Sequence, residues 1–285
     1  MAEKQTVKQQ GKLLEFLFTS LVGWSKKKVK QRLQGASVSV NGVVTTKHDH
    51  LLNIGDVVEV GVVQKSAALR QSTSKLEIIY QDKDLIAVNK PAGLLSVGTT
   101  KENRQHALAL LRTQLSRGKN TLKLWPVHRL DRETSGVLLF ATSKEVREAV
   151  MSKWSASEKT YLAIIEGTPE AYTGTISEPL RLDEKEYRMH VGAHPEAKRA
   201  VTHYKVQESS GKSSLVEVNI ETGRQHQIRA HMAWLGHSVV GDERYGTKGL
   251  RMGLHALRLS IVHPKSKKPL CFEVDAPRDF YGLLK

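Results

Sequence analysis

Apolar residues between positions 11 and 62 follow first a helical and then a strand-like spacing. Six of them predict an amphipathic helix: Leu13, Leu14, Phe16, Leu17, Phe18 and Leu21. Further along, valines alternate with serines up to Asn41-Gly42, the dipeptide most typical of a tight hairpin turn, and a return strand begins at Val43. This part of the chain therefore predicts a compact unit of two helices and a hairpin.

The second of these helices is strongly basic. It follows Trp24, with Ser25 as its expected N-cap and Gly35 placed to end it in the left-handed conformation. Val29 and Leu33 lie four residues apart and predict one apolar face. The remaining positions carry five cations: Lys26, Lys27, Lys28, Lys30 and Arg32.

Residues 63–75 contain no acidic residue and little periodicity, which is typical of a linker. Beyond them, strand-like runs at Glu77–Tyr80 and Leu85–Asn89 begin a longer mixed pattern of helices and strands that continues to the C-terminus. Thr142, with Glu145 three residues later, predicts a capping box at a helix start. We therefore expect a domain at 1–62, a linker at 63–75 and a domain at 76–285.

Composition narrows the possible partners. The 285 residues contain 44 Lys+Arg against 29 Asp+Glu, a net charge of +15. Such an excess favours a polyanionic partner, and nucleic acid is the commonest in the cytosol. The alternative is a basic surface that serves only solubility. The polar start, the lack of a long apolar run and the single Cys271 predict a cytoplasmic protein with no membrane span and no disulfide.

Several familiar motifs are incomplete, so we expect neither a cofactor nor a metal. Gly211-Lys212-Ser213 resembles the end of a phosphate-binding loop, but Val206 occupies the position of the required first glycine. His226 and His231 are five residues apart with no glutamate between them, unlike a helical two-histidine zinc site. Any chemistry must then come from side chains.

The polar segment 126–136 is the best candidate for that chemistry. It precedes an apolar strand, Val137–Ala141, and a loop at the end of a rigid strand presents reactive groups well. Within it, Asp131 lies between Arg129 and Arg132. A carboxylate beside guanidinium groups stays ionised at neutral pH, which suits a nucleophile or a base rather than a general acid. Taken alone, however, Arg-Leu-Asp-Arg is more often a surface ion pair than a catalytic site.

The whole segment closely resembles the catalytic motif of the RluA-type family of RNA pseudouridine synthases, in which the aspartate of an HRLD sequence is essential. Further stretches resemble motifs of this family in the same order: Asn89–Leu94, Lys159–Ala163, Thr222–His231 with its continuation to Gly246, and Leu254–Ala256 with His263-Pro264. The resemblance covers essentially all of residues 76–285.

The resemblance implies roles for individual residues. Asp131 corresponds to the catalytic aspartate, Arg229 to an arginine that pairs with it, and Tyr161 to a tyrosine in the uridine pocket. The Asn89–Leu94 segment is expected to form a turn that braces the catalytic loop. No cofactor is implied, since the reaction detaches uracil from ribose and rejoins it through carbon without net redox change.

Three further residues are expected as active-site support. Arg129, or less favourably Arg132, would fill the space left when the target uridine leaves its helical stack. His128 and Ile228 lie next to Arg129 and Arg229 in the same two motifs.

The resemblance also implies an α+β fold with a mixed, largely antiparallel central sheet. The pattern of residues 1–62 resembles the small N-terminal α/β alpha-L RNA-binding module, which would place Lys26–Arg32 against RNA. The expected partner is structured RNA, with ribosomal RNA favoured and tRNA possible. We expect a monomer with no obligate protein partner.

Two other functions fit parts of the sequence. A non-catalytic RNA-binding or ribosome-assembly factor on the same scaffold would be expected to have lost Asp131, Tyr161 or Arg229, and all three are present. A glycoside hydrolase would need a second carboxylate near Asp131, whose flanks are basic instead.

Overall fold

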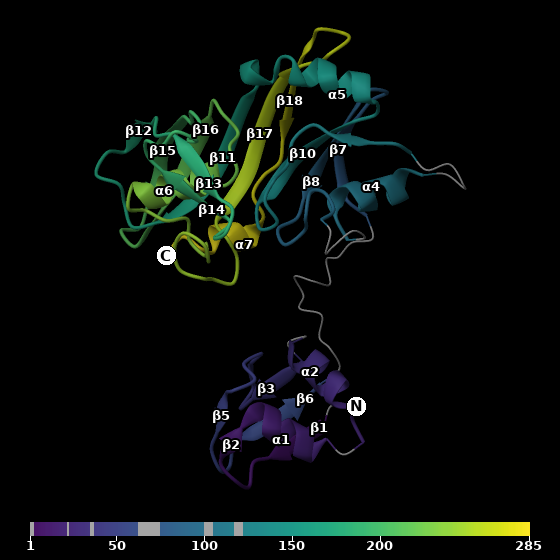
Figure 1. Ribbon diagram of the computed structural model, residues 1–285, viewed down its shortest axis with the longest axis vertical. Coiled ribbons are helices and arrows are strands. Elements are labelled where there is room, and N and C mark those ends of the chain that lie inside the picture. Colours follow the sequence, from purple (N-terminus) through teal and green to yellow (C-terminus); the bar gives the residue numbers. More distant parts are fainter. Residues whose placement is uncertain (1–2, 22, 35–36, 62–74, 100–104, 117–121) are drawn as a thin grey trace. The chain divides into compact units, whose positions relative to one another are not determined.

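The computed structural model describes residues 3–21, 23–34, 37–61, 75–99, 105–116 and 122–285. The chain divides into two compact units, Met1–Thr73 and Ser74–Lys285 (Figure 1). Gly35 and the expected linker 63–75, apart from Lys75, lie outside the described residues. No helix in the described ranges is both long enough and apolar enough to cross a membrane.

The first unit is a small α/β structure. Its elements are β1 (Glu3–Thr6), β2 (Gly11–Lys12), α1 (Leu13–Ser20), α2 (Lys26–Gln34), β3 (Val38–Val40), β4 (Val43–Val44), β5 (Leu51–Leu52) and β6 (Val57–Val60). The main sheet has the order β1-β6-β3-β4, and β2 pairs with β5. The turn at Asn41-Gly42 has positive φ at both residues, +51° and +80°, so the predicted tight hairpin is confirmed.

The helices of this unit bury the apolar faces that the sequence predicts. Leu13 and Leu17 from α1 pack with Val29 and Leu33 from α2 over the sheet. The predicted cap of α2 is confirmed, because the backbone N–H of Lys28 donates to Ser25 Oγ at 3.3 Å.

The basic residues of α2 cover its outer side. Lys26, Lys27, Lys28 and Lys30 are exposed, and Lys28 Nζ lies 3.8 Å from the centroid of the Trp24 ring. Arg32 is partly buried and donates to the backbone oxygen of Gly61. The expected basic face therefore exists, with one cation partly used within the fold.

The second unit is built on one large sheet. The path through it is β12-β15-β16-β11-β17-β10-β8-β7, with β18 paired to β17 and β9 to β10. Its strands are β7 (Glu77–Gln81), β8 (Leu85–Lys90), β9 (Trp125–Pro126), β10 (Ser135–Ala141), β11 (Glu158–Glu166), β12 (Thr173–Ile176), β15 (Thr202–Ser209), β16 (Ser213–Ile220), β17 (Leu254–Val262) and β18 (Pro269–Glu273). A separate hairpin is formed by β13 (Leu180–Asp183) and β14 (Arg188–Val191).

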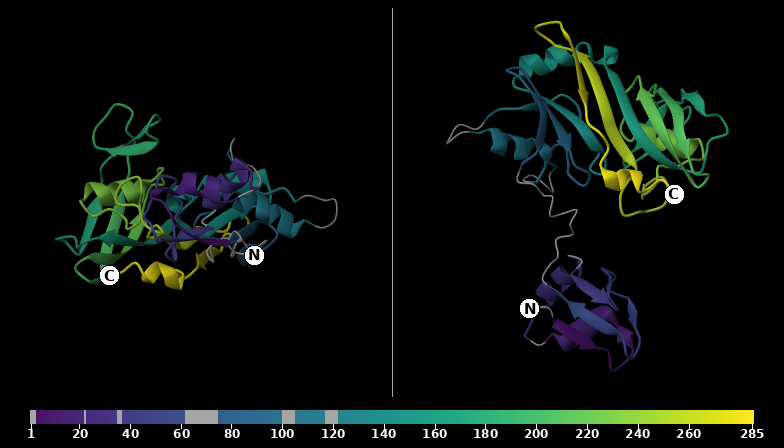
Figure 2. Two further views of the ribbon diagram at one scale, coloured as in Figure 1. Left: turned by 90° about the horizontal axis from the view of Figure 1, so that it is seen from below. Right: turned by 180° about the vertical axis from the view of Figure 1, so that it is seen from behind.

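Helices cover both faces of this sheet (Figure 2). They are α4 (Ala107–Leu115), α5 (Lys144–Met151), α6 (Gln227–Trp234) and α7 (Arg278–Tyr281). Apolar residues of α4 and α6 pack on one face, and Tyr161 of β11 contacts both clusters. Apolar residues of α5 and α7 pack on the other face. The fold is therefore α+β with a mixed, mostly antiparallel sheet, as expected.

The start of α5 differs from the expectation by one residue. Ser143, and not Thr142, is the N-cap, and its hydroxyl accepts from the backbone N–H of Val146. Thr142 instead donates to the backbone oxygens of Lys83 and Asp84 and thereby ties the end of β10 to the β7–β8 turn.

Strands β10 and β17 run parallel, whereas the other pairings in the large sheet are antiparallel. Gly136 makes this pairing possible. Its φ is +112°, and a Cβ there would lie 2.1 Å from the carbonyl oxygen of Ala256. The backbones of β10 and β17 are therefore in direct contact at the end of the segment that carries Asp131.

We predict that Gly136→Ala destabilises the protein by about 3 kcal/mol or more, because it adds a steric clash to an unfavourable φ. Gly211→Ala is the matched control. Gly211 also has a positive φ, +84°, but nothing lies within 4 Å of an added Cβ, so only about 1 kcal/mol is expected. Urea denaturation measures both variants, and equal losses would contradict this explanation of Gly136.

Candidate active site

A large open cavity of about 1410 Å³ lies in the second unit. Its lining comes from the 95–99 segment, the 126–134 segment, β11, the β13–β14 hairpin, α6 and the 241–254 segment. Asp131, Tyr161 and Arg229 all line it. The cavity therefore brings Asp131 together with Arg229, which lies 98 positions further along the chain.

Lys90 stabilises the backbone of the loop that carries Asp131. The Lys90 side chain is fully buried, and its Nζ donates to the backbone oxygens of Pro91, Leu94 and Arg132 at 2.9, 2.7 and 3.1 Å. Burial lowers the pKa of Lys90 to about 7, although the charges of nearby carboxylates oppose this shift. Gly93 N–H also donates to Arg132 O at 2.8 Å. The Asn89–Leu94 segment thus fixes the catalytic-loop backbone.

The Asp131 carboxylate pairs with Arg229 of α6. Arg229 Nη1 donates to Asp131 Oδ2 at 2.9 Å. The same guanidinium group donates from Nε and Nη2 to both oxygens of Asp242, at 2.6 and 2.8 Å. The Asp131 side chain is 29% exposed, whereas those of Arg229 and Asp242 are 10% and 0% exposed. One buried arginine therefore links a fully buried carboxylate to one that faces the cavity.

The charges in this network stabilise one another. Burial alone would raise the pKa of Asp242, but hydrogen bonds and charge from Arg229, with backbone donors at Arg244 and Tyr245, lower it below its ordinary value. Burial alone would lower the pKa of Arg229, but Asp242 and Asp131 raise it above its ordinary value. Asp242 and Arg229 are therefore both charged at neutral pH.

The neighbours of Asp131 in the sequence do not pair with it. Arg129 and Arg132 are exposed, and neither forms an ion pair with Asp131 within the described residues. The positive charge that contacts the Asp131 carboxylate therefore does not come from these flanking arginines, contrary to the expectation from the sequence. Arg229 supplies it instead.

Tyr161 and Ile228 form an apolar wall of the cavity. Ile228 is 4% exposed in the core cluster against which Tyr161 packs. Burial raises the pKa of Tyr161, and the charge of Asp131 raises it further, so the hydroxyl stays neutral. An apolar wall beside a carboxylate suits the binding of a planar ring that has polar groups along one edge.

His128 has a different environment. Its Nε2 accepts from the backbone N–H of Leu139 at 3.2 Å, and its ring stacks on Trp154 with centroids 5.4 Å apart. Burial lowers the pKa of His128 to about 4, with Lys159 adding to the shift. A neutral ring that accepts from β10 braces the strand behind the loop, and none of its hydrogen bonds within the described residues reaches Asp131.

Three residues in or next to the cavity received no role from the sequence. Asp242 and Tyr245 lie in the continuation of the third motif, and His226 lies within its first part, with Nε2 3.8 Å from Asp131 Oδ2. The resemblance marked all three as parts of a motif. Only the folded arrangement shows that Asp242 holds Arg229 and that His226 faces Asp131.

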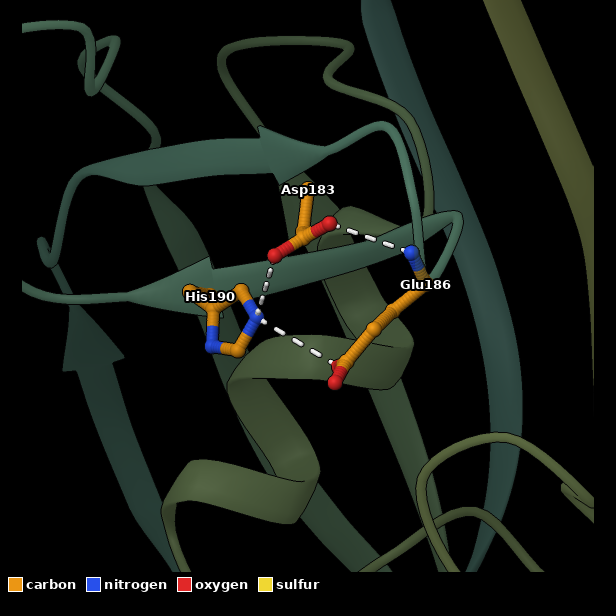
Figure 3. Close-up of side chains that lie close together, drawn as sticks. All are labelled: Asp183, Glu186 and His190. Atoms are coloured by element: carbon orange, nitrogen blue, oxygen red, sulfur yellow. Dashed lines mark hydrogen bonds and ion pairs between the residues drawn. The ribbon is translucent and has the colours of Figure 1, made fainter.

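A cluster of potential metal ligands lies on the β13–β14 hairpin (Figure 3). His190 Nε2 is 3.8 Å from both Asp183 Oδ2 and Glu186 Oε2. Asp183 Oδ1 also accepts from the backbone N–H groups of Lys185 and Glu186, which is how an aspartate stabilises a tight turn. These contacts are accounted for by the hairpin itself, and we assign no metal to it.

We predict that Asp242→Asn lowers the free energy of unfolding at neutral pH by about 3 kcal/mol, because it leaves Arg229 partly unpaired in the interior. Since the pKa of Asp242 is depressed in the folded state, its contribution is present above its ordinary value of 3.8 and is lost as the pH falls below it. The stability of the variant should therefore fall less steeply below pH 4. Denaturation at several pH values tests this, with the exposed Asp275→Asn as control.

The sequence and the fold are similar to those of known proteins. A family model described as RNA pseudouridylate synthase matches residues 84–234. The chain is 34% identical to the ribosomal large subunit pseudouridine synthase D of Zymomonas mobilis, over 74% of this chain and 72% of that protein. It is 38% identical to the tRNA pseudouridine synthase C of Vibrio parahaemolyticus, over 69% and 88%.

A solved structure agrees with these sequence matches. The human RNA pseudouridylate synthase domain containing 4 superposes with a TM-score of 0.61 and 28% identity, over 73% of this chain and 91% of that one. The family match includes both Asp131 and Arg229. The chain thus belongs to the RNA pseudouridylate synthase family and is an isomerase that acts on RNA.

Proposed function

We propose that Asp131 is the catalytic carboxylate that converts uridine in RNA to pseudouridine. The observation that carries this proposal is the 2.9 Å contact of Arg229 with Oδ2, in a cavity that leaves the carboxylate partly exposed. Arg229 orients the Asp131 carboxylate, which acts at the ribose as a nucleophile or as a stabilising group. The bond from the anomeric carbon to N1 breaks, a bond from that carbon to C5 forms, and the C5 proton is lost while N1 gains one.

The apolar wall holds the base during this exchange. Tyr161 stacks on the uracil and assists proton transfer, and Ile228 supports it from the core. His128 acts indirectly, through the strand behind the loop. Extrusion of the uridine costs a few kcal/mol of stacking energy, and the exposed Arg129 at the cavity edge fills the vacated space.

Ribosomal RNA is the substrate we favour, with tRNA as the alternative. One relative is named for the ribosomal large subunit and another for tRNA. The first unit favours structured ribosomal RNA, because its exposed lysines on α2 form a basic face that suits phosphate binding. This unit, residues 1–62, acts as an alpha-L RNA-binding module, the linker 63–75 connects it, and residues 76–285 carry the catalysis. The protein acts as a monomer in the cytoplasm, where its RNA is found.

The first test is Asp131→Asn, which keeps the size of the side chain and removes its charge. We expect RNA binding to change by less than about threefold, and tritium release from RNA carrying C5-tritiated uridine to fall at least about 10³-fold, as for other essential catalytic groups. The exposed Asp275→Asn should release tritium at the wild-type rate. Persistent release by Asp131→Asn would show that another residue performs the chemistry.

The second test concerns the basic face of the first unit. Neutralised phosphates make RNA affinity fall with salt, with a slope of about 0.7 per phosphate contact for single strands. Removal of residues 1–75 deletes the four exposed lysines of α2, so we expect this slope to fall by about 3, which filter binding at several salt concentrations measures. The second unit has its own buried core, and thermal unfolding of the truncated chain verifies that it folds. An unchanged slope would mean that α2 is not the anchor.

A further inference from the structure

His226 lies at the entrance to α6 in an unusual backbone conformation. Its φ and ψ are +50° and +19°, in the left-handed region that residues with a Cβ enter rarely. Such conformations are concentrated at functional sites, where the surrounding structure holds them. The side chain is 7% exposed and lines the cavity of Asp131. The roles proposed above do not include this ring.

Hydrogen bonds around the ring determine which of its nitrogens carries a proton. The backbone N–H of Met189 donates to the hydroxyl oxygen of Tyr245 at 2.7 Å, and that oxygen lies 3.1 Å from His226 Nδ1. With the phenolic oxygen accepting from Met189, both groups are satisfied when the Tyr245 hydroxyl donates its proton to Nδ1. In this arrangement Nδ1 is the acceptor and carries no proton.

The ring is also neutral. Burial lowers the pKa of His226 to about 4; Arg229 and Arg244 add to this shift, while Asp131 and Asp242 oppose it. A neutral imidazole has one N–H group, and because Nδ1 accepts, that group is at Nε2.

The Nε2–H group faces the catalytic carboxylate without bonding to it. The distance from Nε2 to Asp131 Oδ2 is 3.8 Å, too long for a hydrogen bond. Oδ2 already accepts from Arg229. Across the described ranges of the chain, the hydrogen bonds of the ring involve only Nδ1. The Nε2–H group of His226 is thus held next to Asp131, and it has no hydrogen-bond acceptor among the described residues.

We propose that His226 is a catalytic residue whose Nε2–H donates a hydrogen bond to an oxygen of the target uridine as that nucleotide lies against Asp131. Tyr245 fixes the tautomer, and the backbone of β14, through Met189, fixes Tyr245. The inference rests on the proposed role of Asp131. It adds the neutral Nε2–H donor of His226 to the pair formed by Asp131 and Arg229.

Glutamine and asparagine at this position separate the donor role from a purely structural one. The amide nitrogen of Gln reaches the place of Nε2, whereas that of Asn reaches the place of Nδ1. The backbone has the opposite preference, because Asn, and Gly still more, adopt the left-handed conformation readily. If only the backbone mattered, His226→Asn and His226→Gly would be the better substitutes.

The measurement is single-turnover tritium release with excess full-length enzyme on C5-tritiated total RNA from a strain that lacks the gene. This probe contains the target RNA whatever its identity. We expect His226→Gln to keep the maximal rate within about threefold, and His226→Asn and His226→Gly to lose about 10- to 100-fold, as for removal of one transition-state donor. The enzyme concentration at half-maximal rate should stay the same in all three variants.

His203 provides the matched control, since its ring is 42% exposed, bonds Glu221 and lies outside the cavity. Its Gln and Asn variants should have equal rates. An Asn or Gly variant of His226 that is as fast as the Gln variant would overturn the proposal. If Asp131→Asn is inactive while the His226 variants are equal, only this inference fails; if Asp131→Asn stays active, the role of Asp131 itself is wrong.

Discussion

The buried carboxylate of Asp242 is the point on which the geometry of the site depends. It binds the guanidinium group of Arg229 through two hydrogen bonds and accepts from the backbone N–H groups of Arg244 and Tyr245. With its own side chain fully occupied, it orients Arg229 so that one remaining nitrogen reaches Asp131. A buried charge is tolerated only when paired and hydrogen-bonded. The position of the cavity-facing carboxylate therefore depends on a second carboxylate that is fully buried.

The loop of Asp131 is fixed by the backbone as well as by charge. Lys90 donates a hydrogen bond to the carbonyl oxygen of Arg132. Gly136, at the end of the loop, lies so close to β17 that a Cβ atom would clash with it. Arg229, on α6, contacts the loop through the Asp131 carboxylate. A side chain that is held between rigid elements moves little when a substrate binds. A short loop can therefore present it in a fixed geometry, which favours catalysis.

Local features of the fold were readable from the sequence, because each depends on residues close together in the chain. The Asn41-Gly42 hairpin and the Ser25 cap are examples, and both are present. The cap of α5 was assigned one residue early, since Thr142 and Ser143 carry the same chemical group and only the hydrogen bonds distinguish them. Motif resemblance supplied the fold and the principal cavity residues. It could not supply contacts across the fold, such as Asp242 with Arg229, because spacing along a chain does not determine which side chains meet.

Local reasoning about charge failed at Asp131 for the same reason. Its flanking arginines are exposed at the cavity rather than paired with it, and this changes the meaning of the basic composition. The cavity lining carries twice as many basic as acidic side chains, yet its centre holds two carboxylates around a single arginine. The arginines that line the cavity can therefore attract phosphates while Arg229 is fully engaged. Without that separation, the phosphates of an RNA and the Asp131 carboxylate would repel each other in the cavity.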